Sequence, residues 1–302
     1  MNTPEYLKKG DKIAILCPAS YISGDLTPAY NILLDWGLQL EIAPSTEAQF
    51  HQFAGNDELR AQDLQQALDN PDIKAIIAGR GGYGSVRLID TLDFSAFKKK
   101  PKWIIGFSDI TVIHSHIQRQ FQIATIHGQM VKSFLEATPE SLQTLKNTLF
   151  GKNADLYYDT PNPSNRNGHS RGVLTGGNLA ILQSIIASPS DIDYKDKILF
   201  LEDVGESYYN IDRMLWTLKR AKKLDKLKGL IIGGFTSLKD SDPSFGQTIE
   251  EIVIDKVKEF DYPVTFNCPA GHIDDNRALI FGEEVELTVT TEKTSITYPN
   301  RK

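Results

Sequence analysis

The chain contains few cysteines and no long apolar run. Only two of its 302 residues are cysteines, Cys17 and Cys268, which are too few for a disulfide framework or a thiolate zinc site. No apolar stretch approaches the roughly 20 residues that span a bilayer, and the first residues lack an apolar signal segment. We therefore expect a protein of the reducing cytoplasm that has no membrane partner.

A broad basic surface is also missing. The formal net charge is −6, and charged residues of both signs are interspersed along the chain. The one dense basic run, Lys98-Lys-Lys-Pro-Lys102, falls between an expected helix and an expected strand, where a solvated loop is the simpler interpretation. This composition predicts no nucleic-acid partner.

Short apolar runs alternate with helical patterns in the first half of the chain, which is typical of a parallel sheet covered by helices. We expect strands at residues 12–17, 39–43, 73–78 and 103–105, and helices at residues 30–36, 56–70 and 85–90. The fold class is therefore α/β, with an N-terminal, doubly wound, mostly parallel sheet of the Rossmann or flavodoxin type over residues 1–155.

Residues 156–171 are rich in Asn, Pro, Ser and Gly, and we interpret them as a linker. Residues 172–302 then form a second, mixed α/β domain. We expect its helices at residues 178–188, 210–222 and 248–260, and its strands at residues 198–201 and 230–232. Two alternating segments, 278–281 and 285–289, are joined by Gly-Glu-Glu and predict a β-hairpin near the end.

Ser108 stands between an expected strand and an expected helix, in Gly106-Phe-Ser-Asp-Ile-Thr111. A serine on such a turn can expose its hydroxyl above the sheet, beside the N–H groups of the helix start, as a nucleophile requires. The G-x-S-x-G pattern is incomplete because Ile110 replaces the last glycine. The plainer alternative is that Ser108 or Asp109 caps the helix.

The segment Gly79-Arg-Gly-Gly-Tyr-Gly84 follows a strand and matches G-x-G-x-x-G. A dinucleotide site would have this context, but its fingerprint opens on the first strand of a domain, and here at least two strands come earlier. A glycine-rich turn selected for its backbone shape is the simpler interpretation. A third possibility is that the loop brings N–H groups to a reacting oxygen as half of an oxyanion hole.

Carboxylates follow the strand at 198–201, and His272 lies in a Gly- and Pro-containing loop. Serine, glutamate and histidine together can form a catalytic triad, because histidine takes the hydroxyl proton and the acid orients the histidine. A metal site competes, although its possible ligands show no recognised spacing: Glu202, Asp203, Glu206, His272, Asp274 and Asp275. His114 and His116 suit either the surface of their helix or its packing face, and Asn178 suits either a helix cap or a substrate contact.

Several segments together resemble the LD-carboxypeptidase family, serine peptidases that include the microcin-immunity hydrolases. The resemblance runs from near residue 10 to about residue 290. One departure is Phe107, where the family frequently has tyrosine. The matching segments are Gly10-Asp-Lys-Ile-Ala-Ile-Leu-Cys-Pro-Ala-Ser20, Gly79-Arg-Gly-Gly-Tyr-Gly84, Gly106-Phe-Ser-Asp-Ile-Thr111, Leu174-Thr-Gly-Gly-Asn178, Phe200-Leu-Glu-Asp203 and Gly271-His272.

The resemblance implies a triad divided between two domains, with Ser108 as nucleophile, His272 as general base and acid, and Glu202 as its orienting partner. It also implies an oxyanion hole formed by the backbone N–H groups of Asp109 and Gly82. The substrate contacts that it suggests are Arg80, Gly81, Tyr83 and Asn178. No metal and no organic cofactor are needed.

The reaction implied by the resemblance is hydrolysis of the amide between the L-centre of a diamino acid and a terminal D-residue in a murein tetrapeptide. Such enzymes are expected to be cytoplasmic homodimers that recycle cell-wall peptides. An alternative within the family is an immunity-type hydrolase of peptidyl-nucleotide or acyl-adenylate analogues. An alternative outside enzymes is a protein that binds a small ligand without chemistry.

Overall fold

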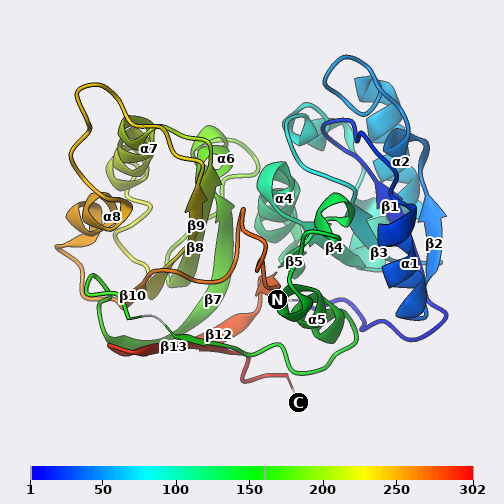
Figure 1. Ribbon diagram of the computed structural model, residues 1–302. Helices are drawn as coiled ribbons and strands as arrows, with labels where there is room; N and C mark the ends of the chain where they lie inside the picture. Colours follow the sequence, from blue (N-terminus) through cyan, green and yellow to red (C-terminus); the bar gives the residue numbers. More distant parts are fainter. Residues whose placement is uncertain (1, 160, 302) are drawn as a thin grey trace.

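The computed structural model describes residues 2–159 and 161–301, which form two sheets with helices packed around them (Figure 1). The first sheet has the strand order β11-β5-β4-β3-β1-β2. Its strands are β1 (Lys12–Leu16), β2 (Gln39–Ile42), β3 (Ile73–Ala78), β4 (Trp103–Gly106), β5 (Thr125–His127) and β11 (Leu279–Phe281). Its helices are α1 (Thr27–Asp35), α2 (Asp57–Asp69), α3 (Ser95–Lys99), α4 (Thr111–Phe121) and α5 (Pro139–Leu149).

All neighbouring strands of this sheet are parallel except β11, which runs antiparallel to β5. Strand β3 shows why the strands form here, because five of its six residues are buried and nearly all are apolar. Such continuous runs are typical of strands that helices cover on both faces. Helix α2 begins where the Asn56 side chain accepts a hydrogen bond from the Leu59 N–H (2.9 Å). The expected doubly wound sheet is therefore confirmed.

The second sheet has the order β10-β9-β8-β7-β12-β13-β6. Its first four strands are parallel neighbours and the remaining pairs are antiparallel, so the sheet is mixed. Its strands are β6 (Leu156–Asp159), β7 (Gly168–Asn178), β8 (Lys197–Val204), β9 (Gly229–Thr236), β10 (Val264–Thr265), β12 (Glu284–Val289) and β13 (Lys293–Thr297). Its helices are α6 (Leu179–Ser184), α7 (Tyr208–Arg220) and α8 (Ile249–Val257).

Three local expectations differ from the structure. The hairpin expected between residues 278–281 and 285–289 does not form, because β11 joins the first sheet and β12 pairs with β7 and β13. All three residues of β11 are buried, as a strand covered on both faces requires, whereas β12 alternates. The hairpin at this end of the chain is β12–β13 instead.

The expected linker, residues 156–171, carries β6 and the first residues of β7, so part of it belongs to the second sheet. The expected helix at 85–90 is replaced by two 3-10 turns, η2 (Ser85–Arg87) and η3 (Ile89–Thr91). The Leu88 N–H bonds the Ser85 carbonyl and the Thr91 N–H bonds the Leu88 carbonyl, three residues back in each case.

Helix α4 lies between the two sheets and faces β7 and α6 (Figure 1). The Thr175 hydroxyl donates to the Gln118 side chain (2.9 Å), and the Asn178 N–H donates to the Thr111 hydroxyl (3.1 Å). One apolar core continues across this boundary. Among the described residues, no helix combines the length and the apolar character that crossing a membrane requires.

Candidate active site

Ser108 sits on a sharp turn between β4 and α4. Its φ is +62°, a left-handed conformation that non-glycine residues rarely adopt, and the 3-10 turn η4 (Ser108–Ile110) leads directly into α4. Gly106 makes the turn possible, because a Cβ there would lie 2.8 Å from Cγ1 of Ile110. The structure therefore places Ser108 on a strained strand-to-helix turn of the kind that presents a nucleophile.

The glycine-rich loop 79–84 lies against this turn. A Cβ on Gly81 would be 2.9 Å from Cβ and 3.1 Å from Oγ of Ser108, so only glycine leaves the hydroxyl uncrowded. The Gly81 carbonyl accepts a hydrogen bond from the Ser20 N–H (3.3 Å), and the Gly82 N–H of the same planar peptide therefore points to the opposite side. Within 2–159 and 161–301, the N–H groups of Gly82 and Asp109 have no hydrogen-bond partner.

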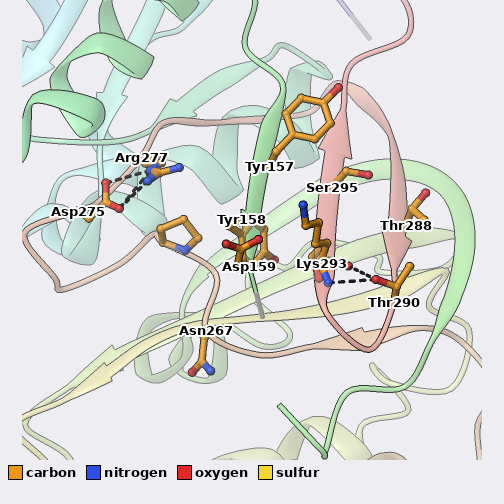
Figure 2. Close-up of a pocket in the computed structure, with 12 residues that line it drawn as sticks. Tyr157, Tyr158, Asp159, Asn267, Asp275, Arg277, Thr288, Thr290, Lys293 and Ser295 are labelled. Atoms are coloured by element: carbon orange, nitrogen blue, oxygen red, sulfur yellow. Dashed lines mark hydrogen bonds and ion pairs between the residues drawn. The ribbon is translucent and has the colours of Figure 1, made fainter. Parts of the chain in front are cut away.

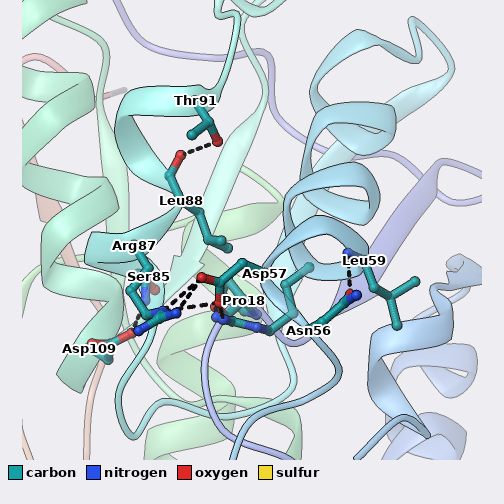
Figure 3. A network of polar contacts seen from close by, with 10 residues as sticks. Pro18, Asn56, Asp57, Leu59, Ser85, Arg87, Leu88, Thr91 and Asp109 are labelled. Carbon is teal, nitrogen blue, oxygen red and sulfur yellow. Dashed lines mark hydrogen bonds and ion pairs between the residues drawn. The ribbon is translucent and has the colours of Figure 1, made fainter. Parts of the chain in front are cut away.

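The Asp109 side chain joins the turn to the loop. Its Oδ2 accepts a hydrogen bond from the Ser85 N–H (2.8 Å), and its Oδ1 is buried without a partner (Figure 3). Burial raises the pKa of the Asp109 carboxyl, while its hydrogen bonds from Ser85 and Gly84 act against that rise. Asp109 thus binds the loop through its side chain and leaves its backbone N–H beside Ser108 unpaired.

The buried side chain of Arg60 packs against the same glycine-rich loop. The Arg60 side chain is fully buried, donates to the Pro18 carbonyl (2.6 Å) and pairs with Asp57. Asp57 also binds the exposed Arg87 (2.6 Å), which completes the network in Figure 3. A Cβ on Gly84 would lie 2.5 Å from Nη1 of Arg60, so the loop rests directly on the guanidinium.

His272 and Glu202 form a close pair in the second half of the chain. Nδ1 of His272 lies 2.5 Å from Oε2 of Glu202, whose side chain is fully buried at the end of β8. Burial lowers the pKa of His272, but the hydrogen bond and charge of Glu202, with the charge of Asp203, outweigh it and raise the pKa above 6.5. Because Nδ1 is engaged, Nε2 is the ring nitrogen left for proton transfer.

The loop that carries His272 is tightly shaped. Gly271 has a φ of +111°, and a Cβ there would lie 2.7 Å from Cβ of Glu202. The His272 carbonyl accepts a hydrogen bond from the Thr236 hydroxyl (3.0 Å), which holds the loop on β9. The ring of His272 packs 4.9 Å from that of Phe107, the residue before Ser108. The structure thus pairs His272 with Glu202 and places the His272 ring against the residue that precedes Ser108, and no hydrogen bond between described residues joins Ser108 to His272.

Models of the LD-carboxypeptidase N-terminal and C-terminal domains match residues 13–128 and 171–287. A probable murein peptide carboxypeptidase of Bacillus subtilis is 30% identical over 97% of this chain and 93% of its own length. The murein tetrapeptide carboxypeptidase of Pseudomonas aeruginosa is 31% identical over 91% of this chain and 92% of its own length. The chain belongs to the LD-carboxypeptidase family.

Solved structures agree with the family fold. The muramoyltetrapeptide carboxypeptidase of Oxalobacter formigenes superimposes with a TM-score of 0.84 at 30% identity, covering 96% of this chain and 100% of its own. MccF in complex with glutamyl sulfamoyl guanosine reaches a TM-score of 0.86 at 21% identity, covering 97% of this chain and 98% of its own. The chain is therefore a peptidase of this family, and the alternative of a binding protein without chemistry is set aside.

Within this LD-carboxypeptidase-family chain, the expected substrate contacts lie in different settings. Asn178 is 5% exposed, caps α6 through the Ile181 N–H (3.1 Å) and donates to Asp203 (2.9 Å), so the structure favours the capping interpretation over a substrate contact. Arg80 donates to the Tyr21 carbonyl (2.8 Å). Tyr83 is 46% exposed near Phe53 and stays available to a ligand.

The acidic residues considered as metal ligands are engaged separately. Asp203 accepts two hydrogen bonds from the start of α6 and one from the Val204 N–H, and desolvation raises its pKa to about 6. Asp275 pairs with Arg277 (2.9 Å), and Glu206 bonds Asn210. Across the described ranges, no three His, Cys, Asp or Glu side chains are grouped so that they could hold a metal ion.

His114 and His116 are buried, so they are packing residues and not helix-surface residues. His114 bonds the Gly106 carbonyl (2.9 Å) and burial lowers its pKa to about 4, while His116 bonds Ser190 (3.0 Å). Sequence reasoning missed the role of Arg60, because a single arginine in a polar helix carries no signal of burial. It also assigned no role to His127, which is buried near His272, or to Asn276, which lies within the His272 loop.

A cavity of about 690 Å³ lies behind the His272 loop, between that loop and β6, β12 and β13 (Figure 2). Pro269, Asp275 and Arg277 line it from the loop, and Tyr157 and Lys293 line it from the strands. No member of the predicted triad lines it, so it is separate from the site around Ser108.

Proposed function

We propose that this chain is a serine carboxypeptidase that cleaves the amide between the L-centre of a diamino acid and a terminal D-amino acid in murein tetrapeptides. The observation that carries the proposal is the 2.5 Å contact between Glu202 and His272, with the His272 ring packed beside the Ser108 turn. Relatives named murein peptide and murein tetrapeptide carboxypeptidases supply the substrate class.

In the proposed reaction, Ser108 is the nucleophile and Nε2 of His272 takes its proton as the Oγ–carbon bond forms. The same proton then passes to the departing amino group, so that the carbon–nitrogen bond breaks and the D-amino acid leaves. Water next attacks the acyl-enzyme and gives a proton to His272, which passes it to Oγ of Ser108 as the Oγ–carbon bond breaks and the shortened peptide leaves. Glu202 orients the ring and stabilises its cation throughout.

The negative oxygen of the tetrahedral intermediate needs donors that are already in place. We assign this role to the backbone N–H groups of Asp109 and Gly82, because both are unpaired and flank Ser108. A site of this kind contributes on the order of a hundredfold or more in rate for each donor. The chemistry requires no metal and no organic cofactor.

Substrate contacts are proposed for Arg80, Gly81 and Tyr83, all in the loop beside Ser108. Gly81 leaves room for the scissile amide, since any side chain there would crowd the hydroxyl. The exposed ring of Tyr83 offers a surface for the peptide. The cytoplasmic recycling role and the homodimer stay predictions from the resemblance, and light scattering of the purified protein tests the second of these.

The proposal is tested with the peptide L-Ala-γ-D-Glu-diaminopimelate-D-Ala, following D-Ala by mass spectrometry. We expect release by the wild-type protein with or without EDTA, and a loss of at least about 10⁴-fold in Ser108→Ala. Release that EDTA abolishes would contradict the metal-free mechanism. No release by folded wild-type protein would overturn the murein substrate and direct the assay to acyl-adenylate analogues, the immunity-type alternative.

A further inference from the structure

The loop that carries His272 is held by both halves of the molecule. Besides its bond to β9, it makes a series of hydrogen bonds to α5 and to the segment that precedes α5, which belong to the Ser108 half. In Figure 1 this orange segment passes between the two sheets. The bonds run from Gln129 to the Asp274 carbonyl (3.1 Å), Thr138 to Asp275 (3.0 Å), Ser141 to the Asn276 carbonyl (2.9 Å) and the Ala278 N–H to Thr144 (3.0 Å).

Asn276 is the interior residue of this loop. Its side chain is completely buried, and its Oδ1 accepts a hydrogen bond from the N–H of Gly271 (2.8 Å). Gly271 directly precedes His272 and packs against Glu202. The amide of Asn276 therefore fixes the backbone from which the His272 ring projects. Its Nδ2 is buried and has no hydrogen-bond partner among the described residues.

His127, the last residue of β5 in the first sheet, is close enough to Asn276 for the Asn276 side chain to act on its pKa. It is completely buried among Phe107, Phe200 and Phe281, whose ring centroids lie 5.0 to 5.8 Å from its own. Within the described part of the chain, neither of its ring nitrogens has a hydrogen-bond partner. Burial holds the pKa of His127 well below 6.5, so the ring is neutral, and the Asn276 side chain acts on it in the opposite direction.

A neutral imidazole has one nitrogen that accepts a hydrogen bond. Because Oδ1 of Asn276 accepts from Gly271, only its NH₂ group is left to act on His127. The buried Asn276 side chain thus holds the backbone before His272, and its NH₂ group and the His127 ring are the polar groups left to pair across the boundary with the first sheet. A buried polar group without a hydrogen bond lowers the stability of the fold. Pairing between these groups therefore favours the one loop position in which they meet.

We propose that Asn276 is a positioning residue that sets the His272 loop against the first sheet, through Gly271 and His127. The inference rests on the proposed function, since it assigns Asn276 a part in aligning the base with Ser108. Asn276 itself touches no reacting atom. The charged groups that face His272 are Glu202 and Asp203, and the neutral His127 is a further titratable group near it.

The test compares Asn276→Ala with the wild-type protein by steady-state D-Ala release and by an NMR titration of the His272 ring. We expect kcat to fall about 10- to 100-fold with KM little changed, because a displaced base slows chemistry more than binding. The pKa of His272 falls toward 6.5, because the ring loses its fixed contact with Glu202. A folded Asn276→Ala protein with wild-type kcat and wild-type His272 pKa would overturn the proposal.

Thr144→Ala is the matched control, because it also removes one hydrogen bond from the loop but at Ala278, away from Gly271. We expect it to lower the thermal midpoint while leaving kcat and the His272 pKa unchanged. An equal effect of Thr144→Ala on both readouts would mean that general loosening of the loop explains the result, which overturns the proposal.

His127→Phe tests the other side of the contact and decides the question if Asn276→Ala does not fold. The phenylalanine ring fits the aromatic surroundings but cannot accept a hydrogen bond from Asn276. We therefore expect a smaller fall in kcat, about 3- to 10-fold, and a fall in the His272 pKa as in Asn276→Ala. No change in either readout overturns the proposal. If the wild-type protein releases no D-Ala, only the proposed function is overturned. The NMR titration needs no substrate and still tests the role of Asn276.

Discussion

The two sides of the site are built in different ways. On the Ser108 side, the proposed groups are backbone N–H donors and a strained turn, and they come from two connections of the mostly parallel first sheet. On the His272 side, the important groups are two side chains that lie 70 residues apart in the chain and meet at 2.5 Å. The first side thus depends on backbone shape, and the second depends on one short contact between side chains.

Because of this difference, the two sides of the site respond to different kinds of substitution. Backbone changes near Ser108 act through crowding, since Gly81 is the residue that leaves the hydroxyl free. Side-chain changes at Glu202 act through charge, because a buried carboxylate keeps the His272 ring oriented and raises its pKa. Variants chosen on each side therefore test the comparison directly.

The largest effect is expected for Glu202→Gln, which keeps the shape and removes the charge. Activity should fall by about 10⁴-fold, the size found when a triad acid becomes an amide. The pKa of His272 should fall as well, since burial still disfavours the cation, and the acid limb of kcat/KM moves to lower pH. D-Ala release across a pH series measures both.

Asp203→Asn is the control for that charge, since the Asp203 carboxylate is adjacent in sequence but binds the start of α6. We expect a loss of less than about tenfold in activity. If Asp203→Asn were as damaging as Glu202→Gln, the orienting role assigned to Glu202 would be wrong.

A pair of alanine substitutions has an intermediate effect and separates the two sides. Gly271→Ala meets Cβ of Glu202 at 2.7 Å and has a φ of +111°, so we expect about a 100-fold loss of activity and about 1–3 kcal/mol less stability. Gly81→Ala meets Ser108 at 2.9 Å without a left-handed φ, so activity falls but stability changes less. Urea unfolding and D-Ala release measure the pair, and equal stability losses would contradict the comparison.

The smallest effect is expected for Arg87→Ala at the outer end of the Arg60 network. The Arg87 side chain is exposed, and exposed ion pairs contribute little because water screens them. Activity should stay within about twofold, and the thermal midpoint should change by less than about 2 °C. A large loss of activity would mean that the network positions the glycine-rich loop from its surface end as well.

Much of the architecture could be predicted because its signals are local. The apolar run of β3 and the break at Gly106 before Ser108 are read from neighbouring residues, and both appear in the structure as expected. The hairpin prediction failed for the opposite reason. The alternation around 278–289 suits a hairpin, but β11 finds its partner in β5, far away in the chain.

The candidate site also divides into features that local sequence indicates and features that depend on long-range packing. Residue type and order pointed to Ser108, Glu202 and His272, and the resemblance assigned their roles, but neither indicates how the His272 loop is held. Asn178 illustrates the limit, because its cap and its bond to Asp203 depend on where β8 lies beside β7.

Local sequence therefore determines the strands, the helix starts and the turn at Ser108, because steric limits on the backbone act over a few residues. Only the tertiary structure decides that β11 crosses to the first sheet, that Arg60 is buried against the glycine-rich loop and that the buried Asn276 side chain binds Gly271. Burial and the pairing of buried polar groups are properties of the packed chain, since they depend on residues that sequence separates.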